Sequence, residues 1–374
     1  MVDVGTSWTK GELFAGRYEL GDEPLGRGEF GEVWPAYDRK RRHHVALKLL
    51  RTDDEVAQRL SRNHELADSY DPVADSAWQE ASLLTSLESP NILRVNNADM
   101  AVDVPFIDSV LAAGGTARDE MRPHGVTPSR AVHLLRGTLR ALQLCHDHGL
   151  LHRDVKPSNV FITSTGDAQL GDFGCAGRMN EDGTAKPIGD PSVRPPDVLK
   201  GARASVAADV YGAGVTLYAL LAGEEPFPRR SDEDFKALRA RVAAGMPDIR
   251  DVAPHVSLAL AKVVRRATAP KAADRYATAA DFDAALAGLA RPKADMSRLS
   301  ADDSGPMHAA HQRCWRVVRR SDLATGYVCQ RPSGRKFDID VTRYKGQAHR
   351  ELTRTSLPAG AVVVHLRRVF DRLR

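Results

Sequence analysis

The residues of this chain with the clearest chemical potential lie in the octapeptide from His152 to Asn159 and in the Asp-Phe-Gly tripeptide that begins at Asp172. The octapeptide reads His-Arg-Asp-Val-Lys-Pro-Ser-Asn. Asp154 could accept the proton of an attacking hydroxyl, and Lys156 could steady a phosphate during its transfer. Asn159 and Asp172 offer the oxygen ligands that Mg²⁺ prefers. This order of residues indicates metal-assisted phosphoryl transfer rather than a surface loop with ordinary acids.

A short hairpin is expected to connect the two motifs. Two short strand-like segments, Val160–Ile162 and Ala168–Leu170, flank a turn at Thr165–Asp167, where Gly166 has the backbone freedom that a tight turn needs. The hairpin would link the loop that carries the proton acceptor to the metal ligand Asp172.

A glycine-rich segment lies upstream, between Leu25 and Val33, with glycines at Gly26, Gly28 and Gly31. A dinucleotide-binding fingerprint would require a helix to start at these glycines. The segments Val33–Tyr37 and His44–Leu50 instead read as strands, which predicts a flap whose backbone can close over phosphates. Pro35 predicts an edge or a bulge in the first strand, because proline has no amide hydrogen to donate.

Lys48 is the charged residue of the second strand. An ammonium group within an apolar strand is costly unless an anion meets it, so contact with phosphates is favoured over a snorkelling surface lysine. A helical glutamate should orient it, and Glu80 is favoured over Glu65. The reason is that Leu83, Leu84 and Leu87 follow Glu80 at helical spacing, and that residues 89–92 end the helix.

These segments resemble the protein kinase family, specifically the bacterial eukaryotic-like Ser/Thr kinases, over about residues 17–290. Residues 209–215 are similar to the family's helix with a buried aspartate, and residues 269–282 to its closing helices. Residues 105–115 align with the hinge strand. The resemblance implies an α+β, bilobal fold with a small β-rich N-lobe and a helical C-lobe.

The resemblance also implies the site. ATP and Mg²⁺, with Mn²⁺ as the alternative ion, would be the cofactors. Asp154 would be the base, with Lys156, Lys48 and Glu80 as the other catalytic residues, and Asn159 and Asp172 would hold the metal. Ser109 would be the gatekeeper beside the adenine. The nucleotide-binding residues would be Leu25, Gly26, Gly28, Gly31, Val33, Ala46, Lys48, Ser109, Val110 and Ala112, of which Val110 and Ala112 would bind adenine through their backbones.

The chain departs from the family pattern in three places. Residues 52–75 form an unusually long, charged insert. The family's Ala-Pro-Glu is replaced by Pro195-Pro196-Asp197, whose aspartate could still pair with Arg275. Asp190 stands where the family has a threonine that helps to bridge the base to the catalytic lysine, which puts the substrate geometry in doubt.

The activation segment runs from Asp172 to Asp197, and its hydroxyl side chains are Thr184 and Ser192. Thr184 is the better candidate for phosphorylation, because Ser192 lies close to the expected peptide site, and Arg153 would receive the phosphate. Glu181 and Asp182 could instead mimic a phosphate. We therefore expect partial activity without phosphorylation.

The composition supports a soluble chain of 374 residues with a kinase domain and a small extra module. It has no run of about eighteen apolar residues and no signal-peptide pattern at its start, so we expect no membrane span and a cytoplasmic location. Its four cysteines include no C-x-x-C pair, which fits reduced thiols.

We divide the chain into an N-terminal extension (1–16), a kinase domain (17–290), a linker (291–307) and a basic C-terminal module (308–374). The module has 15 Lys and Arg against 5 Asp and Glu, a net charge of +10. Since the whole chain carries +4, residues 1–307 carry −6. The strand-like pieces of the module include 361–364, and a basic helix is expected from Leu366 to Leu373.

Three interpretations of this module remain open. It could bind nucleic acid through basic groups and the rings of Trp315, Tyr327 and Tyr344. It could equally dock an acidic protein substrate, or the kinase's own acidic lobe as a regulator. It could also be a solvated basic surface with no partner. A zinc site formed by Cys314, Cys329 and either His308 or His311 is disfavoured by irregular ligand spacing.

The predicted activity is transfer of the ATP γ-phosphoryl group to a Ser or Thr hydroxyl of a protein. The alternatives are a nucleotide-binding pseudokinase scaffold and a kinase that acts on a nucleic acid or another non-protein acceptor. The sequence leaves the substrate, the activating signal and the oligomeric state open.

Overall fold

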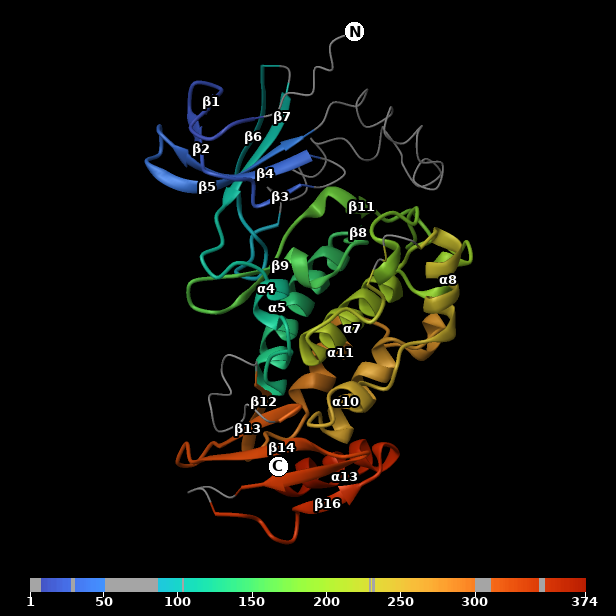
Figure 1. The fold of residues 1–374 in the computed structure, drawn as a ribbon. Helices are drawn as coiled ribbons and strands as arrows, with labels where there is room; N and C mark the ends of the chain where they lie inside the picture. Colours follow the sequence, from blue (N-terminus) through green and yellow to red (C-terminus); the bar gives the residue numbers. More distant parts are fainter. Residues whose placement is uncertain are drawn as a thin grey trace.

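The computed structural model describes residues 8–27, 31–50, 87–102, 104–228, 230, 233–299, 311–342 and 347–374. A β-rich lobe, a helical lobe and a small C-terminal sheet follow one another along its length (Figure 1). This confirms the predicted bilobal α+β fold with an additional β module. The predicted insert and the roles expected for Gly28, Glu65, Glu80, His308 and Tyr344 lie outside the described residues.

The N-lobe is an antiparallel sheet in the order β1-β2-β4-β5-β7-β6, with β3 paired to β4. In β5, Val45, Leu47 and Leu49 are buried against the lobe's apolar core, whereas Ala46 and Lys48 lie on the opposite face. This alternation follows from the twofold period of a strand. The strands are β1 Leu13–Phe14, β2 Tyr18–Leu20, β3 Gly26–Arg27, β4 Gly31–Asp38, β5 His43–Leu50, β6 Val95–Ala101 and β7 Val104–Val110.

The edge expected at Pro35 is wrong, because β4 has neighbours on both sides and its register with β5 is regular. On the other side, the ladder is interrupted opposite Pro35, between the pairs Leu20–Ala36 and Gly26–Val33. There, the Pro35 carbonyl accepts a hydrogen bond from the Gly21 amide at 2.7 Å, and the Val33 carbonyl accepts one from Leu25. Proline is tolerated here because β2 ends at Leu20 and β3 begins at Gly26, so no ladder bond needs its missing N–H.

The helical lobe is built around α5 and α7. Helix α5 starts with Thr127 as its N-cap and Pro128 in the first turn, a common way to begin a helix. Helix α7 is buried along most of its length, which fits its almost entirely apolar sequence. The helices are α4 Ala117–Met121, α5 Pro128–Asp147, α6 Pro196–Leu199, α7 Val206–Ala222, α8 Phe235–Ala244, α9 Ile249–Val252, α10 Leu258–Ala267 and α11 Ala279–Ala287.

Two short strand pairs lie where the lobes meet. The hairpin of β9 (Val160–Ile162) and β10 (Ala168–Leu170) confirms the predicted connection between the two sequence motifs. The second pair joins β8 (Leu150–Leu151), just before the octapeptide, to β11 (Gly177–Arg178), just after the Asp-Phe-Gly tripeptide. The two motifs are therefore held side by side by backbone pairing on both flanks.

The C-terminal module is a five-stranded antiparallel sheet in the order β12 to β16, with helix α13 on one face. Strand β12 lies within residues 291–307, the range that the sequence analysis expects to be a linker. The elements are β12 Ala294–Arg298, β13 Arg313–Arg319, β14 Thr325–Ser333, β15 Lys336–Val341, β16 Arg354–Leu357 and α13 Ala359–Leu373.

Residues 361–364 belong to helix α13, so the strand expected there is wrong. The run of β-branched valines favours a strand locally. However, the residues that bury themselves against the sheet recur at helical spacing, as Val362, Leu366, Val369 and Phe370. Burial of this stripe outweighs the local preference, because most helix stability in proteins comes from tertiary packing.

The module packs on the end of the helical lobe that is remote from the N-lobe (Figure 1). The Ser129 hydroxyl donates to Asp295 at 2.6 Å, and Arg320 forms an ion pair with the same carboxylate at 2.8 Å. On the other side, Arg250 pairs with Asp371 at 2.8 Å. Arg367 on α13 also pairs with Asp251 of the kinase domain at 2.7 Å, so part of the module's basic charge holds the module to that domain.

Trp315 cannot stack on a nucleic-acid base in this structure. It is 1% exposed and packs edge-on against Phe370, with ring centroids 5.3 Å apart. One of the three aromatic rings on which the nucleic-acid interpretation relied is therefore part of the module's core. Among the helices that the structure describes, none has the length and apolar character needed to cross a membrane.

Candidate functional site

The backbone of the octapeptide is held by a buried carboxylate from the C-lobe, that of Asp209 on α7. Its oxygens accept hydrogen bonds from the amide nitrogens of His152 and Arg153, at 2.9 and 2.8 Å. The His146 ring nitrogen Nε2 lies 2.9 Å away. Burial raises the pKa of Asp209, but the contact with His146 and the nearby amides outweigh it and leave the pKa lowered. Asp209 therefore acts as a charged clamp.

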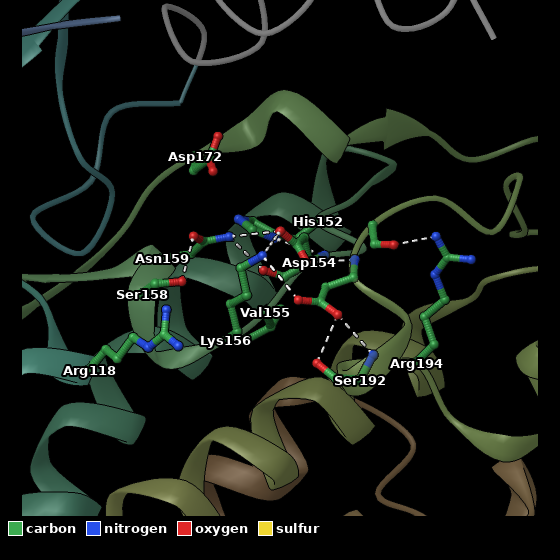
Figure 2. A network of polar contacts seen from close by, with 12 residues as sticks. Arg118, His152, Asp154, Val155, Lys156, Ser158, Asn159, Asp172, Ser192 and Arg194 are labelled. Carbon is green, nitrogen blue, oxygen red and sulfur yellow. Dashed lines mark hydrogen bonds and ion pairs between the residues drawn. The ribbon is translucent and has the colours of Figure 1, made fainter. Parts of the chain in front are cut away.

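This clamp is needed because Arg153 has a left-handed backbone, with φ at 65°. A non-glycine residue in this region costs about 1–3 kcal/mol and persists only where surrounding contacts enforce it. One of the two hydrogen bonds to Asp209 comes from the amide of the strained residue itself, and the other comes from the amide of the residue before it. This turn directs the next side chain, Asp154, toward Asn159 and Lys156 (Figure 2).

Both carboxylate oxygens of Asp154 are oriented by neighbours, and the residue is only 5% exposed. Oδ1 accepts a hydrogen bond from the amide of Asp190 at 2.9 Å. Oδ2 accepts one from the side-chain amide of Asn159 at 3.1 Å and lies 2.8 Å from Nζ of Lys156 (Figure 2). A carboxylate held in this way can receive a proton from a substrate hydroxyl without first reorienting.

Lys156 lies between two carboxylates. Its Nζ is 2.8 Å from Asp154 and 3.7 Å from the Oδ2 atom of Asp190. Burial lowers the pKa of Lys156, but the attraction of Asp154 and then of Asp190 outweighs it, so the pKa is raised. The ammonium group remains charged at neutral pH, as it must to steady a phosphate.

Asp190 makes contacts with three neighbouring groups. Its amide donates to Asp154, one carboxylate oxygen faces Lys156, and the other caps the short 3₁₀ helix Pro191–Val193. That cap consists of bonds from the amide and hydroxyl of Ser192, at 2.9 and 2.8 Å. The replacement of the family's threonine thus leaves the base and the lysine bridged to the activation segment, with one additional negative charge.

The two expected metal ligands offer suitable oxygens. The side-chain amide nitrogen of Asn159 donates to the Asp154 carbonyl at 2.8 Å, so its Oδ1 is the atom available for a cation. Asp172 is 44% exposed and forms a 2.8 Å ion pair with Lys48. The attraction of Lys48, which outweighs burial, lowers the pKa of Asp172 to about 2. A deprotonated carboxylate and an amide oxygen are a donor set that fits Mg²⁺ or Mn²⁺.

The expected nucleotide-binding side chains share one face of the N-lobe sheet. Val33 lies directly opposite Lys48 in the β4–β5 pair, and Ala46 lies opposite Ser109 in the β5–β7 pair. Directly opposed residues of antiparallel strands project to the same face. The Ser109 hydroxyl donates to the Ala46 carbonyl at 3.3 Å. This face is opposite the apolar core of the lobe and turns toward the octapeptide.

The glycine flap has the exposure and the backbone that its expected role requires. Leu25 is 58% exposed, and Gly26 is also exposed on β3. Gly31 has φ at 152°, and a Cβ there would lie 2.1 Å from the Leu49 carbonyl oxygen. No other residue would fit at that position without moving β5.

The hinge presents complementary backbone groups. The Val110 amide donates to the Arg94 carbonyl at 3.1 Å, and the Ala112 carbonyl accepts from the Gly115 amide at 3.2 Å. The Val110 carbonyl and the Ala112 amide are the groups that the resemblance assigns to adenine. An acceptor followed by a donor two residues later matches the amino group and the ring nitrogen of the adenine edge.

Thr184 is held by a residue that the sequence analysis missed. Its hydroxyl donates to Asp182 at 2.7 Å and accepts from Nε of Arg203 at 2.7 Å. Arg153, the expected receiver of a phosphate, donates to the carbonyls of Cys175 and Lys186. Arg203 follows the activation segment by only a few residues. Its positive charge is the feature of the sequence that could have indicated this contact with Thr184.

The end of the activation segment is anchored as the sequence suggested. Asp197 on α6 forms a 2.8 Å ion pair with the buried Arg275, which also donates to three backbone carbonyls. The aspartate thus performs the pairing expected of the family's glutamate. Ser192, in contrast, is 7% exposed and bonded to Asp190, which makes it a poor target for modification in this conformation.

Comparison with known proteins agrees with this geometry. The model of the protein kinase domain matches residues 20–281. The chain belongs to the protein kinase family. Membership implies ATP, a divalent metal ion and protein substrates. The matched range holds every described site residue, whereas the whole C-terminal module lies outside it.

Three bacterial proteins illustrate what the chain is similar to. A probable serine/threonine-protein kinase of Corynebacterium efficiens is 33% identical over 291 residues, covering 75% of this chain and 42% of that protein. Serine/threonine-protein kinase PknB of Mycobacterium tuberculosis is 32% identical over 280 residues, covering 72% and 42%. A probable kinase of Streptomyces coelicolor is 31% identical, covering 73% and 40%. The chain thus spans less than half the length of the relatives it matches.

Proposed function

We propose that this chain is an ATP-dependent Ser/Thr protein kinase in which Asp154 is the catalytic base. The observation that supports this most directly is the orientation of both Asp154 oxygens, by the Asp190 amide on one side and by Asn159 and Lys156 on the other. A scaffold that only binds nucleotide would not need a carboxylate oriented in this way.

The roles follow from the contacts. A substrate Ser or Thr oxygen attacks the γ-phosphorus, its proton passes to Asp154, and the bond to the ADP oxygen breaks. Lys156 balances the charge of the phosphoryl group in transit, and Lys48 and Glu80 would orient the α- and β-phosphates. Asn159 and Asp172 would hold Mg²⁺ or Mn²⁺, which when bound neutralises phosphate charge. Since ATP is a cytoplasmic metabolite, we expect the domain to act in the cytoplasm.

The test is transfer of label from γ-labelled ATP with Mg²⁺, to the chain itself and to a generic basic protein. Asp154→Asn should lower the rate by about 10²–10⁴-fold while nucleotide binding is retained. Asp147→Asn, an exposed acid at the end of α5, is the matched control and should transfer normally. An Asp154→Asn variant that is as fast as the parent would refute the assignment.

The pseudokinase scaffold is the second candidate, favoured by the unusual Asp190. It would show ATP binding with no labelled product from the parent chain in either reaction. For the C-terminal module we propose a regulatory or docking role rather than nucleic-acid binding, because it packs on the C-lobe and buries Trp315. If RNA is added to the reaction and no labelled RNA is found among the products, that result would agree with this role.

A further inference from the structure

The C-terminal module brings together two cysteines that are far apart in sequence. Cys314 on β13 and Cys329 on β14 are direct partners in the sheet, and their sulfur atoms lie 2.8 Å apart. The Cys314 carbonyl accepts from the Leu299 amide, on the β12 side of its strand. The backbone groups of Cys314 therefore point away from β14. Cys314 and Cys329 are therefore a non-hydrogen-bonded pair, the type of antiparallel pair in which the two side chains lie closest together.

His311 adds a third ligand atom. Its ring nitrogen Nδ1 lies 3.3 Å from the Cys314 sulfur, and the ligand atoms of His311, Cys314 and Cys329 all lie within 4.8 Å of one another. The segment that carries His311 is held in place, because the Gln312 amide donates to the Gln330 carbonyl at 2.8 Å. The side-chain carbonyl of Gln312 also accepts a hydrogen bond from the side-chain amide of Gln330 at 2.7 Å. The approach of the histidine is therefore built into the strand pairing.

The two thiols are buried outside the module's described apolar core. Cys314 and Cys329 are 5% and 3% exposed, yet they lie on the face of the sheet opposite helix α13. The module's apolar core is on the other face, around Trp315 and Val328. Asp340 on β15 lies directly opposite Cys329, on the same face as the thiols, and adds negative charge nearby. Two sulfurs, an imidazole and a neighbouring carboxylate are typical of a metal site rather than of a core.

We propose that Cys314, Cys329 and His311 bind a zinc ion that ties the start of β13 to β14. Two thiolates and an imidazole match the preference of Zn²⁺, and a water molecule would complete the tetrahedron. Zn–S bonds of about 2.3 Å place the sulfurs about 3.8 Å apart, so binding separates them by about 1 Å. A disulfide is the competing chemistry, but it would leave the position of His311 unexplained.

The first test is the zinc content of the full chain, purified with a phosphine reductant and without chelator. We expect about one zinc per chain, and less than a tenth of that in Cys314→Ser and in Cys329→Ser. Cys145→Ala, which removes a buried thiol of the kinase domain, is the matched control and should keep the metal. ATP binding by each variant shows that its kinase domain is folded.

A second measurement does not depend on the folding of variants. Co²⁺ titrated into the reduced, metal-free parent chain should produce thiolate-to-cobalt charge-transfer bands, and Zn²⁺ should displace them. His311→Ala should weaken Co²⁺ binding by more than the 10–100-fold typical of losing an outer contact. Absence of both zinc and these bands in the parent would overturn the proposal. So would a Cys314–Cys329 disulfide that persists under the reductant, or equal zinc in the parent and both serine variants.

Discussion

The catalytic segment and the thiol cluster of the C-terminal module both gather ionisable side chains, but their backbones position them in different ways. In the kinase domain the groups lie on a loop whose residue Arg153 is strained, and buried Asp209 must hold it. In the module, Cys314 and Cys329 lie on regular strands, where the register alone brings them together. A strained loop thus depends on a distant clamp, whereas a sheet supplies proximity through pairing.

This difference explains why one site has a local sequence motif and the other has none. A loop site needs particular residues at each position, because the turn, the strain and the chemistry are all local. A cross-strand site needs only two residues that the register makes neighbours, here fifteen positions apart. Sequence spacing is therefore a good guide to the first site and a poor one to the second.

The largest effect in this comparison is expected when the Asp209 clamp is removed. Asp209→Ala removes a buried carboxylate and leaves two amides and His146 without their partner, so we expect a loss of about 3–5 kcal/mol in the free energy of unfolding. Phosphoryl transfer should fall with it, because Asp154 would lose its position. Urea unfolding together with label transfer measures both. A variant with parental stability would show that the strain needs no clamp.

Substitutions of Asp190 test whether its carboxylate affects Asp154 and Lys156 or only stabilises the loop that it caps. Asp190→Ala removes the cap of the 3₁₀ helix, which should cost about 1 kcal/mol, and also one of the two charges beside Lys156. Asp190→Asn retains an acceptor for Ser192 and should lose less stability. Thermal unfolding of the two variants distinguishes the roles, and equal losses would mean that the cap is unimportant.

Acid stability tests the pair of Lys48 and Asp172. Because the pKa of Asp172 is lowered to about 2 from an ordinary value of 3.8, its contribution is present above about pH 4 and is lost as the pH falls toward 2. The carboxylate is 44% exposed, so solvent screening limits the effect to about 1 kcal/mol at most. Asp172→Asn should flatten the pH dependence of the unfolding midpoint in this window. An unchanged slope would contradict the pairing.

The smallest effect is expected at Thr184. Asp182 and Arg203 already hold this hydroxyl, and the activation segment is also tied down by Asp197 and Arg275. Thr184→Ala should therefore retain activity within about tenfold, in line with partial activity of the unphosphorylated chain. Label transfer by the variant, with mass spectrometry of the parent, measures this. An inactive variant would show that Thr184 phosphate is obligatory.

Several elements could be read from the sequence because their causes are local. The β9–β10 hairpin follows from two short strand-like segments around a glycine turn, and the glycine flap follows from the strands that contain Gly26 and Gly31. The pairing of Asp197 with Arg275 was expected from the family resemblance, because an aspartate retains the charge of the glutamate that it replaces. The roles assigned to the site residues remain predictions that the variants above test.

Other elements depended on contacts that no local pattern contains. The valines of 361–364 favour a strand but form a helix, because the sheet of the module buries one stripe of α13. Pro35 occupies an internal strand because β2 happens to end before it. Arg203 reaches Thr184 only through the path of the activation segment.

By itself, the sequence determined the family and the bilobal fold and predicted the residues of the phosphoryl-transfer centre, because that chemistry requires fixed residue types at fixed short spacings. Only the tertiary structure decided how Asp190 replaces a threonine, where the module packs, and that His311, Cys314 and Cys329 meet. These outcomes depend on the burial of apolar faces and on strand register, which are set by the whole chain rather than by neighbours in the sequence.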